Sequence, residues 1–423
     1  MIHLNNLKKP TPRIAFPASL ANNHFTGELW GYYVENTHFF NILSSDAAID
    51  KKRIGRLGKI VEECPFPEDN VRWLITNQAP EVLSSNGVEM LRQSMSKERN
   101  SLLPPVSAVN SKDKVIGFWK NGNLHFIHTE SLTECEQEPY SLKLDVFSRN
   151  TGILESDVML KKGALFIGCG SVGSLAALEL AKAGVGRFML TDNDIFGYHN
   201  ICRHQCGIYD VGRYKTEALK DRILQVNPYA EVKTYNMPIQ DVPLGELTSF
   251  CDANTIVIGG ADNRAGDLYG NHIAQQVGMP FMSIGCWERA FAGEIFYCLP
   301  TGMPTYDDFI EVTGVMSGRV TQNRRFYTTE DELKKVSFEP GISVDINFVT
   351  VIAMKLAIDL LNRDNPNYTQ RLLPHLTQYT LVCNTNDTKI GGEAAEIFSY
   401  PLQVSTSLIV PYAKKEKERI DGV

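Results

Sequence analysis

The sequence predicts an α/β protein, in which a Rossmann-like, mainly parallel sheet is preceded by a smaller α+β domain. Two observations support this prediction. From about residue 160, short apolar runs alternate with helical stretches, which is typical of parallel strands joined by crossover helices. A length of 423 residues favours two domains over one. We place the smaller domain at residues 1–145, the larger one at 146–410 and a polar tail at 411–423.

The smaller domain is predicted from aromatic-rich runs at Gly27–Ile42 and Val115–His128, together with a helical stretch at Ala47–Glu63. Asn121 and Gly122 separate two groups of β-forming residues, and an Asn-Gly pair in this setting predicts a hairpin. We find no catalytic constellation in this part of the sequence. A recognition or accessory role is therefore expected for it.

The larger domain is predicted from a regular succession of strands and helices. A buried apolar strand runs into a glycine-rich turn and a helix, and the same alternation then repeats. The expected elements are strand Ala164–Ile167, helix Val172–Ala183, strand Arg187–Thr191, helix Lys215–Val226, strand Thr255–Ile258 and helix Val349–Leu361.

The bulk composition excludes several classes of function. A net charge of −7 argues against a nucleic-acid partner, which normally requires a basic surplus. The first residues contain no continuous apolar segment of a signal peptide, and no run reaches the roughly 18 apolar residues of a membrane span. Nine scattered cysteines are typical of reduced thiols. We expect a cytoplasmic protein.

The first motif lies directly after the strand that ends at Ile167. The segment GCGSVG, with Gly168, Gly170 and Gly173, opens the following helix. Glycines let the backbone approach a phosphate, and the free N–H groups at a helix N-terminus attract the anion. Alone, this motif is most typical of a dinucleotide-dependent dehydrogenase.

The residues that follow indicate a triphosphate instead. The second strand ends in two acids that can accept ribose hydroxyls, and an arginine and a lysine follow within the next 25 residues. A dehydrogenase does not need these cations, whereas attack of a carboxylate on an α-phosphate does. An acid and an amide after the third strand stand where a magnesium ion would sit. These residues are Asp192, Asp194, Asn200, Arg203, Lys215, Asp262 and Asn263.

The ordered string GCGSVGS…TDNDIFGYHNICRH…DVGRYKTEAL…GGADNR resembles the ThiF/MoeB/ubiquitin-activating superfamily over about residues 147–365. The family usually has Arg-Gln where this chain has Arg203-His204, a variant of bacterial operon-encoded members. The resemblance places Asp192 on the ribose, Asn200, Arg203 and Lys215 on the phosphates, and Asp262 on Mg²⁺. Asp194 and Asn263 are included among the nucleotide-binding residues.

The resemblance also implies the reaction and the partners. The expected reaction is adenylation by ATP of the C-terminal carboxylate of a small ubiquitin-like protein with an extended tail, with release of pyrophosphate. A homodimer is expected, because Arg149 in Phe147–Asn150 matches a segment whose arginine reaches the partner subunit's site. A surface arginine on a linker is the alternative interpretation. A conjugating enzyme is a further expected partner if transfer follows adenylation.

The cysteines do not decide whether the modifier is transferred to a nucleophile of the enzyme after adenylation. The family's crossover loop, expected at about 300–341, contains no cysteine here. The enzyme then stops at adenylation, uses Cys286 or Cys298, or uses a loop hydroxyl of Thr313, Ser317 or Thr321. The hydroxyl ranks last because the loop offers no base, and each cysteine can equally be a small buried apolar residue. The chain has no Cys-x-x-Cys pair, so we predict no zinc.

Two rival functions remain. An NAD-dependent oxidoreductase would have no use for Arg203, Lys215 and Asp262. A non-catalytic, nucleotide-binding scaffold subunit of an activating complex typically lacks one of Asn200, Arg203, Lys215 and Asp262. This chain has all four.

Overall fold

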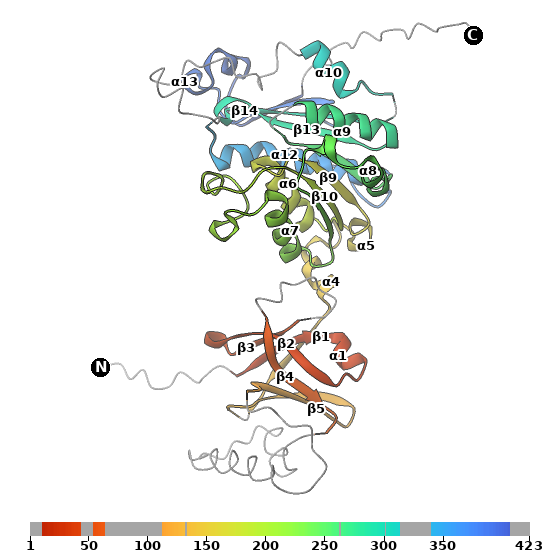
Figure 1. The fold of residues 1–423 in the computed structure, drawn as a ribbon, viewed down its shortest axis with the longest axis vertical. Coiled ribbons are helices and arrows are strands. Elements are labelled where there is room, and N and C mark those ends of the chain that lie inside the picture. Colours follow the sequence, from red (N-terminus) through yellow and green to blue (C-terminus); the bar gives the residue numbers. More distant parts are fainter. Residues whose placement is uncertain are drawn as a thin grey trace, which may run out of the picture. The chain divides into compact units, whose positions relative to one another are not determined.

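The computed structural model describes residues 11–43, 54–63, 112–131, 133–261, 264–300, 302–313 and 340–406. The chain divides into two compact units, Met1–Val146 and Phe147–Val423. In its described part, each unit is built on one eight-stranded sheet (Figure 1).

The N-terminal unit contains a mixed sheet with the strand order β7-β6-β5-β4-β2-β3-β1-β8. Strand β1 pairs in parallel with β3 and β8, and β4 pairs in parallel with β5, whereas the other pairs are antiparallel. The short helices α1 (Ala18–Asn22) and α4 (Leu142–Val146) accompany it. The strands are β1 (Arg13–Pro17), β2 (Gly27–Val34), β3 (Phe39–Ile42), β4 (Gly55–Val61), β5 (Val115–Lys120), β6 (Asn123–His128), β7 (Thr133–Glu134) and β8 (Glu136–Tyr140).

The predicted hairpin is confirmed, and the predicted helix before it is wrong. Asn121 and Gly122 join β5 to β6 with φ of 52° and 76°, as a two-residue hairpin turn of type I′ requires. Residues Gly55–Val61 form β4 rather than the end of a helix. Gly58 lies against β5 so closely that an added Cβ would stand 1.7 Å from the Val115 carbonyl oxygen. Residues 47–53 of the expected helix lie outside the described residues.

The second unit contains a mainly parallel sheet in the order β11-β10-β9-β12-β13-β14-β15-β16. The first five are mutually parallel, and β14, β15 and β16 add antiparallel. This confirms the predicted fold class, a Rossmann-like sheet that a smaller domain precedes along the chain. The strands are β9 (Gly163–Ile167), β10 (Arg187–Thr191), β11 (Glu231–Tyr235), β12 (Thr255–Gly259), β13 (Phe281–Cys286), β14 (Ala292–Cys298), β15 (Tyr379–Cys383) and β16 (Gln403–Thr406).

Helices cover both faces of this sheet (Figure 1). One buried cluster joins alternate strand residues to α6 (Ser171–Lys182), α7 (Lys215–Val226) and α12 (Ser343–Leu361). The opposite cluster joins the intervening strand residues to α8 (Leu244–Phe250), α9 (Arg264–Val277) and α10 (Tyr306–Thr313). The six expected strands and helices are confirmed, although α12 begins earlier than expected. The elements that were not foreseen include β11, α8, α9, β13, α10, β15 and β16. The short helices are α5 (Ser156–Met159) and α13 (Thr388–Gly391).

Within the described ranges, no helix combines the length and the apolar character that crossing a bilayer requires.

Candidate active site

The glycine-rich segment lies where the strand order of the sheet reverses. The chain runs from β9 to β10 and β11 on one side, and then returns to β12 and β13 on the other side of β9. In open α/β sheets, the crevice outside the carboxyl ends of the strands at such a point is the usual ligand site. Gly168 leaves β9 at this edge, and α6 begins three residues later.

Each glycine of this segment has a different local requirement. Gly168 has φ of +87°, and an added Cβ there would lie 3.1 Å from the backbone of Ala261. An added Cβ at Gly173 would lie 2.1 Å from the Gly168 carbonyl oxygen. At Gly170, the N-cap of α6, a Cβ would meet nothing within 4 Å. The segment therefore folds tightly around Gly168 and Gly173 and leaves open space at the start of the helix, where an anion is favoured.

Asp192, directly after β10, is hydrogen-bonded to the backbone of the glycine segment. Its Oδ2 accepts the Cys169 N–H at 2.7 Å, and its Oδ1 accepts the Asp194 N–H at 2.8 Å. Burial raises the pKa of Asp192, whereas these two hydrogen bonds and the nearby charge of Lys215 oppose the rise. A carboxylate has further lone pairs, so both bonds leave capacity for ribose hydroxyls.

Lys215 begins α7 but does not extend into solvent. Its side chain is 10% exposed, and its Nζ donates to Asp194 Oδ2 at 2.5 Å. The Lys215 backbone N–H also donates to the Asp194 carbonyl at 3.0 Å. Lys215 is therefore a buried, paired cation and not a solvated residue of the first helical turn. In this structure, Asp194 is the hydrogen-bond and ion-pair partner of the Lys215 ammonium group.

Asn200 and Arg203 lie on one tight turn between β10 and α7. The 3₁₀ turn Tyr198–Asn200 is closed by the Asn200 side chain, whose Oδ1 accepts the Gly197 N–H at 2.8 Å. The backbone N–H groups of Arg203 and His204 both donate to the Asn200 carbonyl, at 3.1 and 3.0 Å. These hydrogen bonds hold Asn200, Arg203 and His204 in one turn.

His204, which departs from the family's Arg-Gln, makes hydrogen bonds that the sequence did not predict. Its ring is buried, with Nε2 lying 2.7 Å from the Cys169 carbonyl oxygen. The Cys206 N–H donates to Nδ1 at 3.0 Å. Burial lowers the pKa of His204 to about 4. A histidine beside the expected phosphate-binding arginine was the available signal.

The expected metal site cannot be placed in the same way, because Asp262 and Asn263 lie outside the described residues. Ala261, the residue before them, has its backbone against Gly168, at the carboxyl end of β12. Among the residues that are described, no three His, Cys, Asp or Glu side chains gather as metal ligands. Asp262 as a magnesium ligand and Asn263 as a nucleotide contact stay predictions.

Comparison with known proteins identifies the family. Residues 146–387, more than half of the 423-residue chain, match the model of the ThiF family. This chain belongs to the ThiF family.

The relatives of this ThiF-family chain are distant. It is 33% identical over 112 residues to the probable molybdopterin-synthase adenylyltransferase of Porphyra purpurea, a match that covers 26% of this chain and 28% of that protein. It is 28% identical over 176 residues to ubiquitin-like modifier-activating enzyme 5 of Oryza sativa subsp. japonica, covering 39% and 41%. The chain thus spans under half the length of these curated relatives.

Among solved structures, the crystal structure of E. coli MccB with MccA-N7isoASN aligns with 60% of this chain and 66% of that chain. The sequence identity is 17% and the TM-score 0.43.

Arg149 opens the ThiF domain on an exposed 3₁₀ turn, Ser148–Asn150. Phe147 anchors this turn in the core, and Asn150 Nδ2 donates to the Lys182 carbonyl at 2.8 Å. Because the turn is held at both sides, the exposed Arg149 is presented at a fixed place on the surface. Its insertion into a partner's site stays a prediction.

The two cysteine candidates differ sharply. Cys298 ends β14 with no exposed surface, and its thiol lies 3.2 Å from Asn271 Oδ1 and 3.3 Å from Gln275 Nε2. Burial raises the pKa of Cys298 to about 12, which disfavours this thiol as a nucleophile, and its role in transfer stays a prediction. Cys286 is half-buried at the end of β13, on the same sheet edge as Gly168.

The three loop hydroxyls are not placed by the structure. Thr313 ends α10, although its side chain is not among those described, and Ser317 and Thr321 lie outside the described residues.

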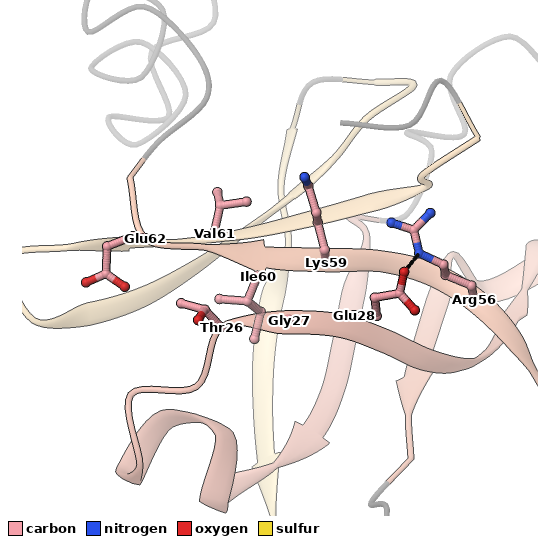
Figure 2. A pocket seen from close by; sticks show the side chains of 8 residues that line it. All are labelled: Thr26, Gly27, Glu28, Arg56, Lys59, Ile60, Val61 and Glu62. Carbon is pink, nitrogen blue, oxygen red and sulfur yellow. Dashed lines mark ion pairs between the residues drawn. The ribbon is translucent and has the colours of Figure 1, made fainter. Parts of the chain in front are cut away.

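A hollow of about 570 Å³ lies in the N-terminal unit. Figure 2 shows Arg56 of β4 directed to Glu28 of β2, with an Nε to Oε1 distance of 3.0 Å, and Lys59 nearby. The lining carries both charges and no member of the predicted nucleotide site. It comprises Thr26, Gly27, Glu28, Arg56, Lys59, Ile60, Val61 and Glu62.

Proposed function

We propose that this chain is an adenylyltransferase that uses ATP to activate the C-terminal carboxylate of a small ubiquitin-like protein. The observation that supports this most is Lys215, a buried ammonium group that Asp194 holds and whose charge acts on Cys169 of the glycine segment. Family membership and the names of the relatives, a molybdopterin-synthase adenylyltransferase and a ubiquitin-like modifier-activating enzyme, point the same way.

In the proposed reaction, a carboxylate oxygen of the partner's last residue attacks the α-phosphorus of ATP. The bond between the α-phosphorus and the bridging oxygen breaks, pyrophosphate leaves, and an acyl-adenylate forms. Negative charge builds up on the phosphate oxygens during this step, so fixed cations lower the barrier. Lys215 and Arg203 supply this charge, and Asn200 adds a hydrogen-bond donor.

The glycine segment would seat the phosphates over the open space at Gly170, beside the first N–H groups of α6. Asp192 would bind the ribose hydroxyls with its remaining lone pairs. Lys215 would turn from Asp194 to a phosphate oxygen as ATP enters. The Asp194 side chain is 59% exposed, so water can solvate its carboxylate when Lys215 leaves.

Magnesium would neutralise part of the triphosphate charge. We assign its binding to Asp262, with Asn263 beside it on the nucleotide. Support comes from Ala261, whose backbone lies against Gly168 and so brings the chain to the glycine segment just before Asp262. A carboxylate oxygen is a ligand type that Mg²⁺ prefers.

The remaining assignments follow from the same function. We assign a homodimer in which Arg149 of one subunit reaches the other's phosphates, supported by its exposed and anchored turn. If a thioester follows adenylation, Cys286 is the thiol on the correct sheet edge. Residues 1–145 would recognise the modifier or a conjugating enzyme. The assigned adenylation domain spans 146–410, with its crossover loop at about 300–341, and the polar tail spans 411–423.

ATP–pyrophosphate exchange with the purified full-length chain tests this proposal, with and without modifiers that end in Gly-Gly. Lys215→Ala should reduce exchange by about 100-fold or more, as expected for a lost transition-state contact. Lys220→Ala, on the same helix, is the matched control and should retain exchange within about twofold. Asp262→Ala should also abolish exchange.

Three results would contradict the proposal. Exchange that survives Lys215→Ala would remove Lys215 from the mechanism. ATP binding without exchange, for every modifier tried, would favour the rival interpretation of a non-catalytic scaffold subunit. Tight NAD binding in place of ATP would favour the oxidoreductase.

A further inference from the structure

Two segments distant in the sequence must meet to form the proposed site. The glycine segment follows β9, and the turn with Asn200 and Arg203 follows β10. Hydrogen bonds within each segment hold that segment in shape, but they do not join the two segments. The hydrogen bond between His204 Nε2 and the Cys169 carbonyl oxygen joins them.

We propose that His204 is a positioning residue, which as a neutral imidazole fastens the turn of Asn200 and Arg203 to the glycine segment. This inference rests on the proposed function, because the two segments are taken to bind the same ATP.

The hydrogen-bond partners determine the protonation of the ring. The Cys169 carbonyl can only accept, so the Nε2 at 2.7 Å must carry a proton. The Cys206 N–H can only donate, so the Nδ1 at 3.0 Å must be bare. An imidazolium would direct a second N–H at the Cys206 N–H. Both bonds are therefore satisfied by a single neutral tautomer.

The surroundings hold the ring in this state. His204 is 8% exposed and packs edge-to-face on Phe196, with ring centroids 4.9 Å apart. Phe196 and Cys206 form a small apolar cluster with Ala218 of α7. The charges that act on the ring are Lys215, which disfavours the imidazolium, and Asp210, which favours it, and burial outweighs both.

A second bond accompanies this one. The Gln205 N–H donates to Ser174 Oγ on α6 at 3.4 Å. The backbone bond from His204 N–H to the Asn200 carbonyl, at 3.0 Å, transmits the position of the ring to Asn200. The glycine segment, the turn and the start of α7 are thus joined through His204.

His204 touches protein groups with both ring nitrogens, so we assign it no contact with ATP. The alternative is that the ring only fills space. Two polar replacements distinguish these roles. The amide nitrogen of His204→Gln can reach the position of Nε2 and donate to the Cys169 carbonyl. The shorter His204→Asn reaches only the position of Nδ1 and keeps the Cys206 bond alone.

The kinetic test measures KM for ATP and kcat in ATP–pyrophosphate exchange with full-length variants. We expect His204→Gln to keep KM within about threefold of the wild type. His204→Asn should raise KM by about tenfold, the effect of one lost hydrogen bond, with a smaller change in kcat. Equal KM values for the two variants would overturn the proposal.

A second measurement does not depend on the activity. Long-range ¹H–¹⁵N NMR of the histidine-labelled, nucleotide-free chain should show one ring with Nε2 protonated and Nδ1 bare from pH 5 to 8. The signal is assigned by its absence in His204→Gln. A ring that titrates near pH 6.5 would overturn the proposal. If this tautomer is present while the wild type shows no exchange, the proposed function fails and the connection through His204 stands.

Discussion

An alanine at position 173 would meet the backbone of the glycine segment. Gly173 is the third residue of α6, and an added Cβ would lie 2.1 Å from the Gly168 carbonyl oxygen and 3.0 Å from its carbon. Because the neighbour is backbone, it cannot turn aside as a flexible side chain would. The start of α6 or the turn at Gly168 must move by about 1 Å to restore an ordinary contact.

The magnitude follows from two opposing effects. Replacing a helical glycine with alanine usually stabilises a helix by about 1 kcal/mol. Overpacking against a rigid neighbour costs about 3 kcal/mol, at the upper end of its usual range. We therefore expect Gly173→Ala to lower the free energy of unfolding by about 2 kcal/mol. Since the turn at Gly168 shifts, ATP binding should weaken as well.

Gly245→Ala is the matched control. Gly245 is exposed in α8, and an added Cβ there meets nothing within 4 Å. The same substitution should stabilise the protein at this position, by up to about 1 kcal/mol. The measurement is the urea midpoint from hydrogen exchange of peptides that cover β9, α6 and α8, which reports on this unit alone. Two variants that shift the midpoint in the same direction would refute the reasoning.

The remaining predictions concern the phosphate space, the buried histidine and the thiols. Gly170→Ala should weaken ATP binding by about tenfold or more, measured by calorimetry, yet cost at most about 1 kcal/mol of stability, since its Cβ enters open space at an N-cap. The pKa of His204 falls on folding from 6.5 to about 4. The unfolded chain therefore binds the proton first, and stability present above pH 6.5 declines by about 3 kcal/mol down to pH 4. Between pH 6.5 and pH 4, the free energy of unfolding of His204→Gln should fall by about 3 kcal/mol less than that of the wild type. Parallel pH dependences of the two proteins would contradict this prediction. Under native alkylation mapped by mass spectrometry, exposed Cys202 should react first, Cys286 more slowly and Cys298 last. Early labelling of Cys298 would show that its site is open.

The N-terminal unit shows where local pattern misleads. Around β4, the apolar residues Ile54, Leu57, Ile60 and Val61 stand three and four positions apart, which is also the spacing of an amphipathic helix. The segment becomes a strand because it pairs with β2 and β5, and β5 begins more than 50 residues later. A local pattern carries no information on such a partner, so the tertiary pairing decided the structure here.

For the ThiF unit, the sequence by itself determined the fold class, the strands and helices around the glycine segment, and the location of the candidate site. Buried parallel strands read as continuous apolar runs, and Gly168 and Gly173 mark a turn that few other residues can form. These signals are local, because each depends on the residues' own backbone and on their immediate neighbours.

Only the tertiary structure decided what the individual side chains can do. Lys215 is held by Asp194, 21 residues away, and His204 by Cys169, 35 residues away. Cys298 was equally eligible with Cys286 in the sequence, and the packing of α9 on β14 buried its thiol and raised its pKa. Charge state, reactivity and hydrogen-bond partners depend on the groups that folding brings into contact, and chain spacing does not encode these distances.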